Sequence, residues 1–386
     1  MKAVELFAGI GGFRIAADRL GMNSVWANDI CPLACSVYRS RFGEQELHES
    51  DIATLVESIP AHDVLTGGFP CQPFSSAGKK RGIQDPRGTL FEYIVETLKR
   101  HSPKYFVLEN VKRLLTMDSG RHFATILASL AELNYSIEWR LLNAIHFGIA
   151  QNRQRVFVIG VRQRANGSGL SGPSARMIEP EEMPRQQRGK VTLSAFVREW
   201  LDIESHGAKF PSWGMARQGQ FTGCDPLRFK SMVPSALLKS ALEPHAAPEF
   251  DFTESTLARL KKSDLVNRFI DGVEILSNQG GGARMGYTVF GINGVAPTLT
   301  ATPSRHYERY KIANCYRRLT NVEYARLQGF PDDHCSAVSV YNQYGLYGNA
   351  VPPPMAEWVL SRLTATGVPL EQLVRHRRQK ELFADA

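Results

Sequence analysis

The sequence predicts an α/β protein: a doubly wound, mainly parallel sheet with a second, smaller and irregular domain. Three observations predict this class. Residues 1–161 alternate short β-like runs with segments of helical periodicity. The alternation stops at Arg162, where a linker-like stretch rich in Gly and Ser follows. Regular patterning returns after Tyr316, so we expect one domain from 1–164 and 313–386 and another from 165–312.

The first domain accounts for most of the expected elements. Phe13, Ala16 and Ala17 recur at helical spacing. Near the end of the chain, Thr320 can cap a helix over 322–328, and Pro352 can start one over 352–363. The expected strands cover residues 3–7, 24–27, 63–66, 105–108, 136–142 and 155–161.

Composition narrows the class of protein. The 386 residues contain 43% hydrophobic and 22% charged side chains, which is ordinary for a globular protein, and no run approaches a membrane span. Six cysteines without a Cys-x-x-Cys pair argue against zinc and against a disulfide framework, and favour a reducing cytoplasm. The net charge of +8 suits a polyanionic partner without identifying one.

The most informative motif is a cysteine held between prolines, Pro70-Cys71-Gln72-Pro73. It follows an apolar run and two glycines, so it is predicted to form a loop at the end of a strand. The prolines fix φ and exclude a helix, which suits the presentation of a nucleophile. A buried structural cysteine in a turn explains the tetrapeptide equally well, because free cysteine is usually buried.

A second motif favours a nucleoside site. The segment Phe7-Ala-Gly-Ile-Gly-Gly12 ends the first strand and opens a helix, and Asp29 follows at the end of the second strand. A carboxylate in that place can bind ribose hydroxyls. Two alternatives stay open: the glycines form a plain tight turn, and Asp29 caps a helix over 32–42.

Further polar groups end other strands. Glu109 closes an apolar strand, which is costly for a glutamate without a partner or a task. Arg153 and Arg155 lie two apart in an extended segment, so both side chains point to one side. Together with Cys71 they form a candidate catalytic set at the ligand-binding edge of an open α/β sheet.

The order of these motifs closely resembles that of the DNA (cytosine-5) methyltransferase family, over residues 3–160 and 317–357. The resemblance implies a Rossmann-like methyltransferase fold and a target-recognition domain at 165–312. The motifs that carry it are Phe7-Ala-Gly-Ile-Gly-Gly12, Asn28-Asp29, Asp51-Ile52, Gly68-Phe-Pro-Cys-Gln-Pro-Phe-Ser75, Arg87-Gly-Thr-Leu90, Glu109-Asn-Val111, Gln151-Asn-Arg-Gln-Arg155, Arg318-Leu-Thr320, Leu327-Gln-Gly-Phe-Pro331 and Tyr347-Gly-Asn-Ala-Val351.

The resemblance also implies a reaction. The Cys71 thiolate would add to ring carbon 6 of a flipped-out cytosine, so that carbon 5 can take a methyl group. Glu109 would act at ring nitrogen 3, and Arg155, with Arg153 nearby, would bind the ring carbonyl oxygen.

S-adenosylmethionine is the implied donor, with S-adenosylhomocysteine as the product. Ile30 stands where the family often has a larger side chain under the adenine. The residues expected to hold the donor are Phe7, Gly9, Ile10, Gly11, Gly12, Asp29, Ile30, Asp51, Ile52, Pro70, Leu90, Asn349 and Val351.

Duplex DNA is the implied partner. Two alternatives stay open: a cognate restriction endonuclease exists as a partner that does not bind stably, or the protein is an orphan methylase. No metal is expected, and we expect a monomer in a prokaryotic cytoplasm, associated with the nucleoid. For the basic loop 79–87, a merely solvated surface is the alternative to phosphate binding. The residues expected to contact DNA are Gln72, Ser75, Lys79, Lys80, Arg81, Arg87, Gln279, Arg284 and Thr298.

Three other functions compete with this interpretation. The same chemistry on RNA is disfavoured by the wording of the Cys71 motif and by a recognition stretch of about 150 residues. A catalytically inactive DNA-binding protein is disfavoured because every expected chemical residue is present. A nicotinamide oxidoreductase is disfavoured because Arg14 replaces the third glycine of the dinucleotide fingerprint. The target sequence cannot be read from the chain.

Overall fold

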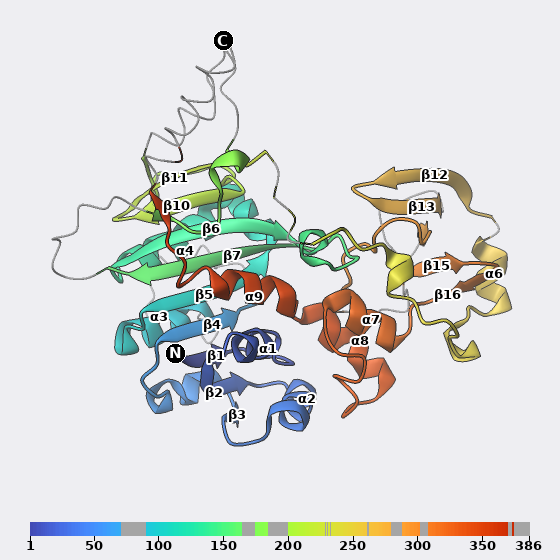
Figure 1. Cartoon of the computed structure of the whole chain (residues 1–386), viewed down its shortest axis with the longest axis horizontal. Coiled ribbons are helices and arrows are strands. Elements are labelled where there is room, and N and C mark those ends of the chain that lie inside the picture. The colour runs from blue at the N-terminus through green and yellow to red at the C-terminus, as the bar shows by residue number, and fades with distance from the viewer. Residues whose placement is uncertain are drawn as a thin grey trace, which may run out of the picture.

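The computed structural model describes residues 1–70, 90–163, 174–183, 200–227, 229, 231, 233–260, 262–278, 288–301, 308–369 and 373. These residues form a large lobe that contains the N-terminus and a smaller lobe built on a second sheet (Figure 1). Helices α7 (Asn321–Gln328) and α8 (Val340–Asn349) lie between the two sheets in this view.

The large lobe is built on a sheet with ten strands in the order β3-β2-β1-β4-β5-β7-β6-β10-β11-β9. Its first five strands are parallel, whereas β7, β6, β10, β11 and β9 each run antiparallel to the strand before them in that order. The strands are β1 (Lys2–Leu6), β2 (Asn23–Asp29), β3 (Leu47–Glu49), β4 (Val64–Gly68), β5 (Tyr105–Val111), β6 (Tyr135–Asn143), β7 (Gln154–Arg162), β9 (Leu201–Asp202), β10 (Trp213–Arg217) and β11 (Gln220–Cys224).

Helices cover both faces of the sheet, as a doubly wound fold requires. On one face α1 (Gly12–Arg19) and α9 (Pro353–Ser361) share a core with strand residues such as Val107 and Phe157. On the other, α3 (Leu90–His101) and α4 (Arg121–Ala131) pack against a core that includes Phe106. Helix α2 (Pro32–Phe42) follows β2 near the edge of the sheet (Figure 1).

The smaller lobe contains a five-stranded sheet in the order β12-β13-β14-β15-β16. Its core is shared with α7 and α8, because Phe290 and Tyr310 belong to the same buried cluster as Tyr324 and Tyr344. The strands of this sheet are β12 (Asp264–Ile270), β13 (Val273–Asn278), β14 (Thr288–Phe290), β15 (Arg309–Ile312) and β16 (Cys315–Arg317), and helix α6 (Glu254–Leu260) precedes them in the chain. A separate two-stranded sheet pairs β8 (Ser174–Ala175) with β17 (Val368–Pro369).

The predicted fold class is confirmed, since an α/β sheet with parallel central strands carries a second, smaller sheet domain. Three features were not predicted, and the first is the short edge strand β3. The hairpin β10–β11 and β9, within residues 201–224, extend the large sheet, although the sequence analysis assigned them to the second domain. The second domain also contains a regular sheet where no periodicity was found. The boundaries of the recognition domain stay a prediction.

Candidate active site

A cavity of about 580 Å³ opens where the parallel strands β1, β2, β4 and β5 end. This is the edge at which open α/β sheets bind ligands, and the volume suits a small molecule of nucleoside size. Its lining residues are Glu5, Phe7, Ala8, Gly9, Ile10, Gly12, Phe13, Asn28, Asp29, Ile30, Cys31, Ala34, Ser50, Asp51, Ile52, Gly68, Phe69, Pro70, Leu90, Glu109, Asn110, Val111, Arg155, Leu346, Gly348, Asn349, Ala350 and Val351.

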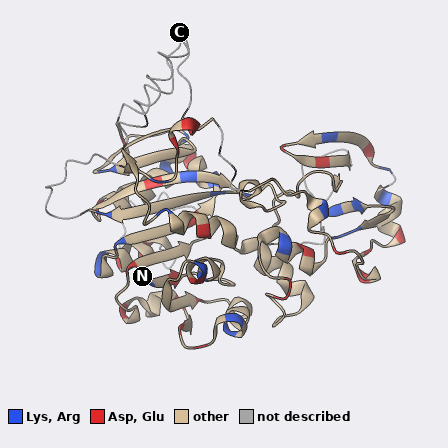
Figure 2. Ribbon diagram, viewed as in Figure 1, with Lys and Arg blue, Asp and Glu red and all other residues tan. Residues whose placement is uncertain are grey.

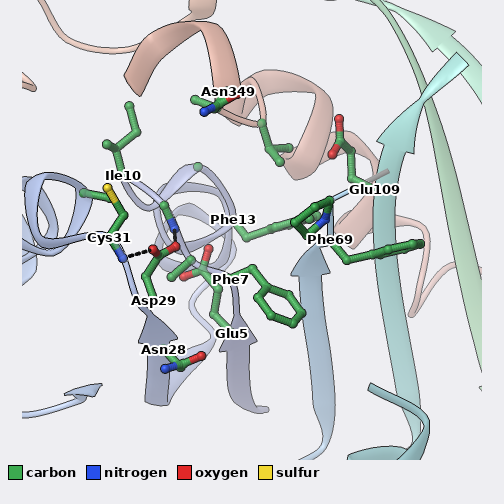
Figure 3. Close-up of a pocket in the computed structure, with 18 of the residues that line it drawn as sticks. Glu5, Phe7, Ile10, Phe13, Asn28, Asp29, Cys31, Phe69, Glu109 and Asn349 are labelled. Carbon is green, nitrogen blue, oxygen red and sulfur yellow. Dashed lines mark hydrogen bonds between the residues drawn. The ribbon is translucent and has the colours of Figure 1, made fainter. Parts of the chain in front are cut away.

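Asp29 connects two segments that line the cavity (Figure 3). One carboxylate oxygen accepts the backbone N–H of Gly9 at 2.7 Å and the other accepts that of Cys31 at 2.8 Å. Cys31, not Asp29, is the N-cap of α2. Asp29 therefore joins the glycine turn to the entrance of α2, which combines the ligand and helix-support interpretations of the sequence. Phe7 reaches the cavity from the end of β1 at φ 56°, a strained conformation for a bulky side chain.

The opposite wall comes from the C-terminal part of the chain. Asn349 and Val351 face the glycine turn across the cavity. Gly12 permits this approach, because a Cβ at residue 12 would lie 2.1 Å from the carbonyl oxygen of Val351. A ring nitrogen of His334 also lies 2.7 Å from the carbonyl oxygen of Ile10. Segments more than 300 residues apart thus form one pocket.

A buried ion pair stands at the other end of the cavity. Arg155 Nε lies 3.0 Å from Glu109 Oε1, and both side chains are almost fully buried. The two come from neighbouring antiparallel strands, in which Val111 pairs with Arg155. Burial raises the pKa of Glu109, and the positive charge of Arg155 opposes that rise. A carboxyl and a guanidinium that share a dry pocket are suited to bind a planar, polar ring.

Arg153 lies elsewhere than the sequence analysis expected. It does not line the cavity, and only 1% of it is exposed. Its guanidinium donates to the carbonyl oxygens of Leu299, Gly348 and Ala350 at 3.1, 3.0 and 2.9 Å. Of the two arginines, Arg155 lines the cavity, whereas the three carbonyl oxygens hold Arg153 outside it.

Asn110 anchors the chain just before the proposed nucleophile. Its Nδ2 donates to the carbonyl oxygen of Phe69 at 3.0 Å, while its Oδ1 accepts the N–H of Val111 at 2.8 Å. Phe69 and Pro70 line the cavity, and the next residue in the chain is Cys71. The sequence analysis quoted Asn110 within a motif but gave it no role. Its place directly after Glu109 was the signal that could have found it.

Glu5 was missed altogether. It lies in β1, is 4% exposed, and sits against the cavity with its Oε2 accepting from the hydroxyl of Tyr38 at 3.4 Å. Burial raises the pKa of Glu5 to about 8. The argument applied to Glu109, that a glutamate within an apolar strand needs a reason, also applies to Val4-Glu5-Leu6 and would have found it.

The structure brings together nearly all residues predicted to hold the donor. Every one except Gly11 lines the cavity. A Cβ at Gly11 would meet the ring of Phe42 at 2.3 Å, so Gly11 serves packing. Ile30 is 65% exposed at the rim, and Asp51 also accepts the N–H of Ala53 at 3.0 Å.

Of the residues predicted to contact DNA, the structure describes Thr298. Its hydroxyl donates to the carbonyl oxygen of Asn152 at 2.6 Å. Cys71 and the other predicted DNA contacts lie outside the described residues, namely Gln72, Ser75, Lys79, Lys80, Arg81, Arg87, Gln279 and Arg284.

The described residues contain no group of three or more His, Cys, Asp or Glu side chains placed to hold a metal ion. In the same ranges, no helix has the length and apolar character needed to cross a bilayer.

Solved structures with a similar fold include a DNMT2 from Spodoptera frugiperda, with a TM-score of 0.61 and 19% identity, covering 94% of this chain and 99% of that one. Dnmt2 from S. pombe gives a TM-score of 0.60 at 18% identity, covering 94% and 98%. At these identities the likeness concerns the fold.

Sequence comparisons identify the family. The type II methyltransferase M.NgoBI of Neisseria gonorrhoeae is 32% identical over 92% of this chain and 90% of its own length. M.Sau3AI of Staphylococcus aureus is 30% identical, covering 92% of this chain and 93% of its own. The model of the C-5 cytosine-specific DNA methylase family matches residues 1–365. The chain therefore belongs to the C-5 cytosine-specific DNA methylase family and is a DNA (cytosine-5) methyltransferase.

Proposed function

We propose that this methyltransferase transfers the methyl group of S-adenosylmethionine to a flipped-out cytosine, within a specific duplex sequence, through a covalent bond to Cys71. The observation that carries the proposal is the layout of the cavity. Asp29 and the glycine turn lie at one end, and the Glu109–Arg155 pair lies at the other. Pro70, next to Cys71 in the chain, also lines the cavity. One cavity thus has room for a donor and an acceptor ring.

The lining fits the donor. Phe7, Ile52 and Leu90 offer apolar surface to a purine ring. Asp29 and Asp51 offer carboxylate oxygens to ribose hydroxyls and amine groups. S-adenosylmethionine, when bound, supplies a methyl group on a sulfonium sulfur.

The protein side chains would carry the other steps. The Cys71 thiolate adds to cytosine carbon 6, and Glu109 supplies a proton or hydrogen bond at nitrogen 3, so electron density moves to carbon 5. Arg155 holds the ring carbonyl oxygen and balances its partial negative charge. The bound donor would supply its methyl group to carbon 5 and would keep the electron pair of its carbon–sulfur bond. A base then removes the carbon 5 proton, elimination regenerates the Cys71 thiolate, and a proton held at nitrogen 3 returns to Glu109.

Duplex DNA as substrate requires that the target base leave the stack, because a base stacked inside a duplex cannot enter an active-site pocket. Acidic and basic residues both occur on the strands of the smaller sheet, and β15 carries basic residues (Figure 2). Similarity to proteins named type II methyltransferases supports a sequence-specific role beside a restriction endonuclease.

The test measures transfer of labelled methyl groups from S-adenosylmethionine to plasmid DNA and to transfer RNA, followed by bisulfite sequencing of the plasmid. We expect 5-methylcytosine in one short recurrent sequence of the DNA, and loss of transfer in Cys71→Ser. Methylation of the RNA alone, or undiminished transfer by Cys71→Ser, would overturn the proposal.

A further inference from the structure

The segment 296–299 of the middle region is joined to the chain that precedes β7. Ala296 donates its N–H to the carbonyl oxygen of Ala150 at 2.8 Å, and accepts the N–H of Asn152 at 2.8 Å. Thr298 donates its hydroxyl to Asn152, and Leu299 donates its N–H to the side-chain oxygen of Gln151 at 3.0 Å. The segment thus runs alongside 150–152 like an added strand.

Arg153 extends this junction to the wall of the cavity. One terminal nitrogen donates to Leu299, and the other donates to both Gly348 and Ala350. Gly348 also touches the middle region directly, because a Cβ there would lie 2.2 Å from the carbonyl oxygen of Thr300. Gly348 and Ala350 line the cavity, and Val351 packs on Gly12 of the glycine turn. A continuous set of contacts therefore runs from residue 296 to the donor pocket.

The buried guanidinium of Arg153 links two segments, one at Leu299 and the other at Gly348 and Ala350. Arg153 is buried, and its Nε has no hydrogen-bond partner among the described residues, so its charge depends on the three carbonyl oxygens. If either segment moved, a buried cation would lose acceptors, which is costly. The two segments are therefore expected to move together. A single ammonium could not span both, whereas the planar fork of arginine can.

We infer that Arg153 is a positioning residue that couples the seating of segment 296–300 on DNA to the shape of the donor pocket. The inference rests on the proposed function, since it takes the cavity as the donor site and the middle region as the DNA-binding part. Coupling of this kind is reciprocal: DNA tightens donor binding by the same factor as the donor tightens DNA binding.

The test measures that factor. The dissociation constant of S-adenosylhomocysteine, which allows no turnover, is determined by calorimetry with and without a duplex that carries the site found by bisulfite sequencing. We expect the duplex to tighten binding to the wild-type protein, and Arg153→Lys to reduce that tightening by about tenfold, within the usual range of coupling between sites. The change in duplex affinity with S-adenosylhomocysteine should fall by the same factor.

Arg140→Lys is the matched control. Arg140 is also a buried arginine, and it donates to a backbone carbonyl oxygen and to Glu182, away from segment 296–300. It should keep the wild-type factor. Thr298→Val provides a milder second variant, because it removes the hydroxyl that donates to Asn152 and leaves the backbone bonds of the segment in place. It should reduce the factor in the same direction, and it decides the matter if Arg153→Lys does not fold.

The outcomes separate the two proposals. A wild-type protein that binds no S-adenosylhomocysteine would overturn the proposed function. A wild-type protein that binds it equally well with and without the duplex would overturn the coupling alone. An unchanged factor in Arg153→Lys, or in Thr298→Val where the lysine variant is unfolded, would overturn the role of Arg153. If Arg153 only stabilised the fold, its replacement would lower the number of binding sites per protein. The factor by which the duplex tightens S-adenosylhomocysteine binding would then stay unchanged.

Discussion

Glu109 and Arg155 lie on adjacent antiparallel strands and form an ion pair of 3.0 Å at the inner end of the cavity. Neither side chain has free access to water, so each determines the charge of the other. Burial alone would favour a neutral Glu109, and the guanidinium limits that tendency. The pair therefore holds a carboxyl and a guanidinium in a fixed geometry beside the cavity.

Glu109→Gln is expected to lower the rate of methyl transfer by roughly 10²–10⁴-fold, the usual contribution of a positioned acid or base. A neutral amide can still hydrogen-bond a ring but cannot supply the proton. Binding of S-adenosylhomocysteine should change little, because Glu109 lies at the other end of the cavity from Asp29. Single-turnover methylation and calorimetry measure the two effects.

A second buried pair supplies the control for this variant. Arg140 and Glu182 form an ion pair of 2.7 Å that is as well buried as the Glu109–Arg155 pair but does not line the cavity. Glu182→Gln should therefore lower stability without a comparable loss of methyl transfer per folded molecule. Equal losses in both variants would mean that Glu109 acts only through folding.

Asp29→Asn tests the donor site. The two carboxylate oxygens accept the N–H groups of Gly9 and Cys31. In the asparagine variant, one of these N–H groups would face the amide NH₂, which is itself a hydrogen-bond donor. We expect S-adenosylhomocysteine to bind about 10–100-fold more weakly, because hydrogen bonds to a charged group contribute about 1.5–3 kcal/mol. Asp202→Asn is the control, since Asp202 lies at the exposed end of β9, where it accepts the N–H of Ser205. Unchanged affinity in Asp29→Asn would leave Asp29 a purely structural role.

The sequence carried enough information for the parallel half of the fold, because local signals specify it. Apolar runs located β1, β2, β4, β5, β6 and β7 to within a few residues, whereas the short β3 was not predicted. Thr320 caps α7 as predicted, together with Glu323 in a capping box. The residues expected to hold the donor came from the family resemblance, and Phe7 and Asp29 among them also lie where parallel strands end.

What the sequence did not reveal depends on distant partners. β10 joins the large sheet through pairs such as Trp213 with Arg140, more than 70 residues apart, and no local pattern encodes that choice. Likewise, the spacing of Arg153 and Arg155 suggested one shared role. Their surroundings differ, because Arg153 finds acceptors at Leu299 and Gly348, well over 100 residues away.

Glu5→Gln is expected to change the pH dependence of stability. Burial raises the pKa of Glu5 from 4.5 to about 8 in the folded protein, against the influence of Arg14 and the Tyr38 hydroxyl and with that of Asp29 and Asp18. A raised folded pKa means that the contribution of Glu5 is complete below pH 4.5 and is lost as the pH rises through about 8. Above that pH the wild type has lost on the order of 5 kcal/mol that the glutamine variant keeps.

Urea denaturation at pH 5 and pH 9 measures this difference in the free energy of unfolding. The variant and the wild type should be nearly equal at pH 5, and the variant should be the more stable at pH 9. Glu44→Gln is the control, because the side chain of Glu44 is 80% exposed and should give no pH-dependent difference. A gap between Glu5→Gln and wild type that is the same at both pH values would contradict the prediction.

Exchange of the smaller lobe should redirect methylation to another sequence. Because residues 201–224 belong to the large sheet, the exchange should cover about 233–316 and not 165–312. Leaving Arg317 in place keeps its buried ion pair with Glu323 at 2.7 Å. The methyltransferase that provides the replacement lobe should have a Thr-Leu pair at the positions of residues 298–299. Bisulfite sequencing reads the outcome, and a folded chimera that methylates the original site would place specificity outside this lobe.

The covalent step can be trapped on a duplex that carries 5-fluorocytosine at the target. After methyl transfer, release requires loss of a proton from carbon 5, and fluorine cannot leave as a cation. The protein should therefore stay joined to DNA through Cys71 and survive denaturing electrophoresis, but only when S-adenosylmethionine is present. Cys71→Ser should give no such species. Wild-type protein that methylates ordinary cytosine yet forms no adduct would exclude the covalent mechanism.

Formation of the same adduct can also test how the chain before Cys71 is positioned. Asn110 donates from Nδ2 to the carbonyl oxygen of Phe69, two residues before Cys71. Asn110→Asp replaces that donor by an acceptor, so the carbonyl is repelled and the thiol loses its fixed approach to carbon 6. We expect adduct formation to slow by about 10²-fold, the usual loss for a misplaced reacting group, while S-adenosylhomocysteine still binds through Asp29. If the adduct forms at the wild-type rate, the bond to Phe69 does not position the nucleophile.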